Sequence, residues 1–312
     1  MNKRYIFGLC LLGIVILIVT VFVINLPNRP LPQTKTEKLS VVTSFYPLYF
    51  FSEQIGGDKA EIINITPAGA EPHDYEPSPQ DIISITKGKL LILNGGGLEA
   101  WGPKVIHIID PNHTLVVTAG EGLAMQEFKQ DEQTVTDPHI WLSPRLAQKM
   151  VDKITEGFVK ADPANSGFYT QNSELLKIKL NVLDQEYQTG LNVCASRNIV
   201  TSHSAFGYLA MDYNLNQVPI TGLSLDAEPS LKKLGEIAKF AKDNKVKYIF
   251  FESLVSPKLS DVIATEIGAK TMVLDPIEGL TPDAIKLGRN YLSVMRDNLA
   301  NLEIALECAP MN

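Results

Sequence analysis

Histidine is the residue type whose settings in this chain point most directly to chemistry. The chain has five histidines, and three of them stand where an element is expected to begin or end. His73 lies in the segment EPHDYEP, His139 lies in DPHIWL, and His203 directly follows the strand-like run NIVTS. Imidazole nitrogens are preferred ligands of Zn²⁺, so these three residues are candidate metal ligands.

A carboxylate completes the candidate set. Asp275 ends the strand-like run TMVLD, just as His203 follows NIVTS. The binding crevice of an open α/β sheet lies beyond the carboxyl ends of its strands, so His73, His203 and Asp275 are expected to face one cleft. Three imidazoles and one carboxylate suit four-coordinate zinc. His107, inside the apolar run VIHII, and His113, in the turn DPNH, are interpreted as structural or surface residues.

Two sets of alternating strand and helix patterns must position these residues. The alternation predicts an α/β protein of two lobes, each a mainly parallel four-stranded sheet flanked by helices. The expected strands are 39–44, 61–65, 89–93 and 115–118, then 198–202, 217–221, 246–251 and 270–274. The expected flanking helices are 48–55, 78–86 and 101–109, then 205–213, 230–243 and 256–267.

Apolar residues at helical spacing predict further helices over 143–160, 166–191 and 282–306. A helix over 166–191 would be about 39 Å long, enough to join both lobes as a stiff connector. No proline interrupts it, so metal binding is expected to order nearby loops without wide closure of the lobes. The polar stretch 126–135, QEFKQDEQTV, is expected to be one of those loops.

The N-terminal segment predicts export. Lys3 and Arg4 precede an apolar run over 5–26, which is long enough to cross a hydrocarbon core of about 30 Å. The run ends in INLP, without the small-residue site of a cleaved signal. We therefore expect an uncleaved signal anchor on the extracytoplasmic face of the bacterial membrane. The alternative is a periplasmic or secreted protein released by signal cleavage.

The expected organisation has five parts: a signal anchor (1–27), a linker (28–38), an N-terminal lobe (39–165), a connecting helix (166–193) and a C-terminal lobe (194–312). The formal net charge is −7 and no Lys/Arg cluster is present, which argues against a nucleic-acid partner. Beyond the apolar run stand two cysteines, Cys194 and Cys308. An oxidising compartment would permit one disulfide, but spacing alone leaves two buried thiols equally open.

The ordered set of motifs resembles the solute-binding proteins of zinc and manganese ABC transporters, the cluster A-I metal-binding family. The matching stretches, in the family's order, are VVTSFYPLYF, EPHDYEPSPQD, NGGGLEAW, DPHIWLSP, IVTSHSAFGYLAMDYNL, AEPSLKKLGEI, IFFE and LDP. The resemblance implies two α/β lobes joined by one rigid helix, with the metal between them. It also implies that His73 and His139 supply metal ligands from the first lobe, and His203 and Asp275 from the second.

This resemblance implies a protein that captures Zn(II) and delivers it to a membrane ABC permease, and we expect a monomer that is not an enzyme. Three nitrogen donors favour Zn²⁺ over Mn²⁺, which prefers oxygen. Mn(II) or Fe(II) binding stays an alternative, because some three-histidine members are assigned manganese and 126–135 lacks the histidines of many zinc binders. A surface adhesin and a zinc metalloenzyme are further alternatives. The enzyme reading is disfavoured, since HExxH is absent and a fourth ligand, Asp275, leaves no open position for water.

Overall fold

The computed structural model describes residues 37–123, 126–130, 133–223 and 229–309. The predicted signal anchor lies outside these ranges, as does the predicted linker apart from its last two residues. Within the part of the chain that is described, no helix combines the length and the apolar character needed to cross a bilayer. From Lys38 onward the chain is one compact unit.

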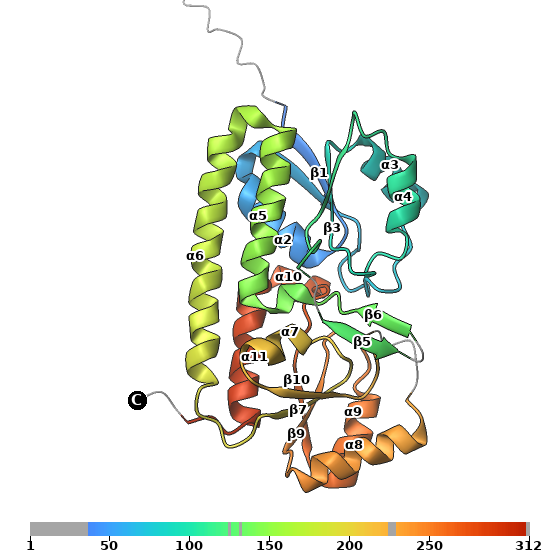
Figure 1. Ribbon diagram of the computed structural model, residues 1–312, viewed down its shortest axis with the longest axis vertical. Coiled ribbons are helices and arrows are strands. Elements are labelled where there is room, and N and C mark those ends of the chain that lie inside the picture. The colour runs from blue at the N-terminus through green and yellow to red at the C-terminus, as the bar shows by residue number, and fades with distance from the viewer. Residues whose placement is uncertain (1–36, 124–125, 131–132, 224–228, 310–312) are drawn as a thin grey trace, which may run out of the picture. The chain divides into compact units, whose positions relative to one another are not determined.

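The first sheet is parallel throughout and has the strand order β2-β1-β3-β4. Its strands are β1 (Leu39–Thr43), β2 (Ala60–Asn64), β3 (Leu90–Leu93) and β4 (Leu115–Thr118). Helices α2 (Tyr46–Gly56) and α5 (Pro144–Ala161) pack on one face, and α3 (Pro79–Lys87) and α4 (Gly102–Ile108) cover the other (Figure 1). Adjacent residues of β1 show the alternation, because Val41 joins the first core and Val42 the second.

The second sheet repeats this plan with the order β10-β9-β7-β8, again parallel. Its strands are β7 (Asn198–Thr201), β8 (Asn216–Pro219), β9 (Tyr248–Phe251) and β10 (Lys270–Val273), with helices α7 (Gly207–Asp212), α8 (Leu231–Asp243) and α9 (Lys258–Ile267). Apolar side chains of α8 and α9 form a separate core against this sheet. The prediction of two four-stranded parallel sheets flanked by helices is confirmed.

A long helix, α6 (Ser166–Gly190), joins the two lobes. It runs beside α5 and then beside α11 (Tyr291–Ala305), as Figure 1 shows. Its buried residues Leu176, Leu180 and Leu183 belong to a core that contains side chains of both lobes. Its Tyr187 hydroxyl donates to the carbonyl of Met295 in α11 at 2.6 Å. The predicted connecting helix is confirmed, and its packing on both lobes makes it a stiff link.

Two segments differ from the sequence-based expectation. The single helix predicted over 282–306 is divided into α10 (Pro282–Lys286) and α11, because Gly288 has a φ of +72° and Asn290 forms a capping box with Ser293 at the start of α11. The stretch 126–135, expected as a loop, contributes to an antiparallel hairpin of β5 (Glu127–Gln130) and β6 (Gln133–Thr136).

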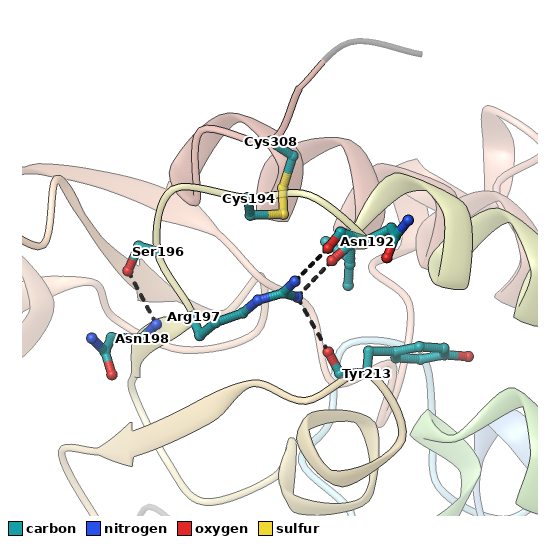
Figure 2. The surroundings of a disulfide bond; sticks show 8 residues. Asn192, Cys194, Ser196, Arg197, Asn198, Tyr213 and Cys308 are labelled. Atoms are coloured by element: carbon teal, nitrogen blue, oxygen red, sulfur yellow. Dashed lines mark hydrogen bonds between the residues drawn. A yellow bond between two sulfur atoms is a disulfide. The ribbon is translucent and has the colours of Figure 1, made fainter.

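A disulfide joins Cys194 and Cys308, so the alternative of two free thiols does not hold in this structure (Figure 2). Cys194 follows α6 and Cys308 follows α11, and the two cysteines also face each other as an isolated antiparallel bridge. Beside them, the Arg197 guanidinium donates to the carbonyls of Leu191 and Asn192 at 2.5 and 2.6 Å. These contacts fasten the end of the connecting helix to the beginning of the second sheet.

Candidate metal site between the lobes

His139 lies in the segment that precedes α5, and Asp137 fixes the orientation of its ring. The Asp137 carboxylate oxygen Oδ1 accepts the backbone N–H of His139 at 2.9 Å and contacts its ring Nδ1 at 2.8 Å. Since a carboxylate only accepts, Nδ1 carries the proton in this contact and Nε2 faces the space between the lobes. The side chain of His139 is fully buried.

His203 follows β7 and is oriented in the same way by the second lobe. Its ring Nδ1 lies 2.5 Å from Oε1 of Glu252, the residue that directly follows β9. The same carboxylate oxygen accepts the hydroxyl of Ser202. His203 and Glu252 are both nearly inaccessible, with exposures of 1% and 2%. The contact leaves Nε2 of His203 facing Nε2 of His139 at 3.3 Å.

His73 has a looser setting, because it lies in the loop between β2 and α3. Its Nε2 lies 3.2 Å from Nε2 of His139, and its side chain is 12% exposed. The backbone N–H of His73 contacts Oε1 of Glu71 at 3.4 Å. A cavity of about 560 Å³ opens beside it, lined by His73, Gly96, Gly97, Val135, Thr136, Pro138 and Leu223. Of the three candidate imidazoles, His73 is the one that lines this cavity.

After β10, the carboxylate that reaches the imidazoles is not the expected one. Asp275 does not join the imidazoles: its Oδ1 accepts the backbone N–H of Ile277 at 2.7 Å. Glu278 stands there instead, with Oε1 at 3.1 Å from Nε2 of His139. The chain turns at Ile277, whose φ of +57° is unusual for a β-branched residue. Trp141 holds this turn by donating its indole N–H to the carbonyl of Pro276 at 2.7 Å.

Four ligand atoms therefore converge, one each from His73, His139, His203 and Glu278. Besides the contacts already given, Oε1 of Glu278 lies 3.3 Å from Nε2 of His73 and 3.4 Å from Nε2 of His203. A tetrahedral zinc ion with bonds of about 2.0–2.1 Å requires its ligand atoms to be about 3.3 Å apart. The five separations given, from 3.1 to 3.4 Å, fit that requirement.

The charges of the site also suit a cation. Burial disfavours the charged form of Glu278, but the surrounding imidazoles hold the pKa of its carboxyl well below the usual range. Burial likewise disfavours protonation of His203, but the carboxylates of Glu252 and Glu278 raise its pKa well above the ordinary value. Burial, reinforced by the Glu278 carboxylate, raises the pKa of Glu71 to about 9. The Glu252 and Glu278 carboxylates thus favour positive charge at the centre of the cluster, whereas Glu71 at neutral pH is held in its uncharged form.

A glycine turn supports the His139 segment. Gly95, Gly96 and Gly97 all have positive φ, and a Cβ on Gly96 would meet the Cα of Pro138 at 3.2 Å. The side-chain amide of Asn94 donates to the carbonyl of Pro138 at 2.9 Å. The NGGG motif therefore packs against the residue that precedes His139.

Three of the four predicted site residues are thus brought together, and Glu278 was missed. The remaining histidines lie elsewhere: His107 is in α4, and exposed His113 contacts Lys89 at 3.3 Å. Glu252 was also missed as a partner of His203, although it follows β9 and the rule that selects the carboxyl ends of strands could have found it.

Replacing Glu252 by glutamine is expected to weaken zinc binding about 10- to 100-fold, because its carboxylate orients the His203 ring and increases its basicity. Ser202→Ala is the matched control, since it removes the other partner of the same carboxylate without touching an imidazole. Competition titration with a zinc chelator measures both affinities. Equal zinc affinity in Glu252→Gln and wild-type protein would show that the contact does not orient the ring for metal.

Two α/β lobes around a buried cluster of histidine and carboxylate groups define a metal-binding protein of the two-lobed solute-binding class. A family model described as zinc-uptake complex component A, periplasmic, matches residues 41–305. The chain belongs to this family, whose name describes uptake of a metal ion and not an enzymatic reaction.

Individual relatives agree with this assignment. The chain is 40% identical over 293 residues to the high-affinity zinc uptake system protein ZnuA of Bacillus subtilis, covering 90% of this chain and 92% of that protein. It is 38% identical to the zinc-binding lipoprotein AdcA of Streptococcus pneumoniae, over 85% of this chain but only 55% of AdcA. The Zn(II)-bound ZnuA-like domain of that AdcA superimposes with a TM-score of 0.76 at 38% identity, over 87% of this chain and all of that domain.

Proposed function

We propose that this protein is the zinc-capturing solute-binding component of an ABC importer, with His73, His139, His203 and Glu278 as the ligands of the transported ion. The carrying observation is that five of the six ligand-atom separations are 3.1–3.4 Å and that all four atoms lie within 4.8 Å of one another, which suits tetrahedral Zn²⁺. Three nitrogen donors and one oxygen favour Zn²⁺ over Mn²⁺. Four protein ligands would close the site, as suits capture better than catalysis by a metal-bound water.

The test is a metal titration of the full chain purified in detergent and freed of metal with a chelator. One equivalent of Zn²⁺ is expected to bind, and equimolar Zn²⁺ is expected to displace Mn²⁺. Preferential retention of Mn²⁺ in that competition would assign the protein to manganese. The lack of saturable binding by either ion would refute capture of these metals.

We further propose that the loaded protein delivers zinc to a membrane permease while anchored on the extracytoplasmic face by its N-terminal segment. Support comes from the apolar run after Lys3 and Arg4 and from the uptake family to which the chain belongs. Sequencing of the native N-terminus tests the anchor. A mature protein that begins between residues 25 and 40 would contradict it.

Zinc binding is expected to change the lobe arrangement little. Residues of both lobes and of α6 share one core. In this core Phe51 packs edge-on against Tyr291, and their ring centroids lie 5.0 Å apart. Wide closure would have to break that core or bend α6. Small-angle scattering of residues 31–312 should therefore give the same profile with and without zinc, with zinc-dependent hydrogen-exchange protection confined to loops such as that of His73. A marked contraction on adding zinc would refute the stiff connection.

A second candidate function, adhesion, is favoured by one observation. The chain is 34% identical, with a TM-score of 0.76, to a laminin-binding protein of Streptococcus agalactiae described as having both adhesin and metal-transporting activity. Deleting the gene for this chain from the bacterium that encodes it separates the two roles. A growth defect that added zinc corrects indicates transport, and loss of laminin binding with normal growth in low zinc indicates adhesion.

A further inference from the structure

A polar cluster joins three elements, α5, α6 and α7. We call it the interlobe brace, and it consists of Ser143, Arg145, Asp184, Asp212 and Tyr213. The hydroxyl of Ser143 donates to Oδ2 of Asp212. The Arg145 guanidinium donates through Nε to Oδ1 of Asp184 at 2.9 Å and lies 3.7 Å from Oδ1 of Asp212. The Tyr213 hydroxyl donates to the same oxygen of Asp184 at 2.9 Å.

The serine and the two carboxylates of the brace are shielded from water, whereas the Arg145 side chain is 43% exposed. Ser143 is fully buried, and the side chains of Asp184 and Asp212 are 11% and 12% exposed. Ser143 Oγ also accepts the backbone N–H of Leu146 at 3.0 Å, which fixes its position at the start of α5. Its one hydrogen is therefore committed to Asp212. A bond in such a setting is costly to break, because the freed carboxylate would stay buried without that donor.

This bond crosses the lobe boundary next to two of the histidines. Ser143 follows His139 after one buried turn, Ile140–Leu142. Asp212 is the last residue of α7, the helix that begins four residues after His203. The Ser143–Asp212 bond thus ties the segment of His139 in one lobe to the segment of His203 in the other. Arg145 and Asp184 attach this tie to the connecting helix α6.

We propose that Asp212 is a positioning residue for zinc capture: by holding Ser143 across the lobe boundary, it sets the spacing between His139 and His203 before the ion arrives. This inference rests on the proposed function. The two Nε2 atoms lie 3.3 Å apart, which is the spacing that tetrahedral zinc requires. Without the tie, zinc itself has to bring the two rings together, and part of its binding free energy is used for that ordering.

The experiment compares Ser143→Ala, Asp212→Ala and the double variant of the full chain in detergent. Zinc affinity is measured by chelator competition, and melting temperatures are measured with and without zinc. Ser230→Ala is the matched control: Ser230 caps α8 by accepting the N–H of Lys233 at 3.2 Å, within a single lobe. Asp212→Asn is the conservative variant, because its amide oxygen can still accept the Ser143 hydroxyl.

Each single alanine variant is expected to raise the zinc Kd about tenfold, and the double variant no more than either, because both single variants remove the same Ser143–Asp212 bond. Asp212→Asn should restore near wild-type affinity. The two capping variants should both melt at lower temperature without zinc, but only Ser143→Ala should lose part of the zinc-induced rise. A wild-type Kd in Ser143→Ala and Asp212→Ala, or multiplying effects in the double variant, would overturn the inference. Failure of wild-type protein to bind zinc would instead refute the proposed function itself.

Discussion

His73→Ala and His203→Ala are each expected to weaken zinc binding by more than about 100-fold. Either substitution removes one of four convergent ligand atoms, and loss of a direct ligand should exceed the 10- to 100-fold effect typical of a residue that only orients one. The two variants should differ in stability. His203→Ala leaves the buried Glu252 carboxylate without its imidazole partner, whereas His73 lies in a partly exposed loop.

His107→Ala is the matched control, since His107 lies in α4 and outside the cluster. Its zinc affinity is expected to equal that of wild-type protein in the same chelator competition. Similar losses in all three variants would mean that histidines bind zinc without a defined site. An unchanged affinity in His73→Ala would remove that residue from the ligand set while leaving the buried ligands to be tested.

Loss of the Cys194–Cys308 disulfide is expected to give the largest loss of folding stability, up to about 4.8 kcal/mol on the chain-entropy model. The bond closes a loop with a sequence separation of 114 residues. Zinc affinity should be preserved, because Cys194 precedes the amino end of β7 whereas His203 follows its carboxyl end. Chemical denaturation of Cys194→Ser/Cys308→Ser and wild-type protein measures the difference in the free energy of unfolding.

Dithiothreitol provides the internal control for this prediction. It should destabilise wild-type protein to the level of the double variant and leave the variant itself unchanged. Two alkylatable thiols outside the apolar N-terminal run, found in denatured and non-reduced wild-type protein, would show that the disulfide is absent in solution.

The regular parts of the fold could be predicted because their patterns are local. Parallel strands are buried on both faces and appear as short apolar runs such as LLIL in β3. The histidines could be found because they stand at strand or helix ends, where an α/β protein places its ligands. The break between α10 and α11 was also marked, by Gly288 and the capping residue Asn290, but the apolar stripe that continues through it favours one helix.

Glu278 could not be predicted in the same way. The carboxyl end of β10 correctly marks the region. However, the Asp275 carboxylate accepts the backbone N–H of Ile277, and the chain turns at Ile277. A β-branched residue with positive φ has no sequence signature, because local preference opposes it. Trp141, from the other lobe, holds the reversed turn. The position of Glu278 therefore depends on a contact between the lobes, and such a contact cannot be predicted from residue spacing along the chain.

Anomalous diffraction at the zinc absorption edge, from crystals of the zinc-loaded protein, tests the central claim most directly. The claim predicts one peak between the lobes, with Nε2 of His73, His139 and His203 and one oxygen of Glu278 at about 2.0–2.2 Å. Asp275 should remain bonded to the backbone of Ile277. A peak coordinated by Asp275 in place of Glu278, or one outside the three imidazoles, would contradict the account.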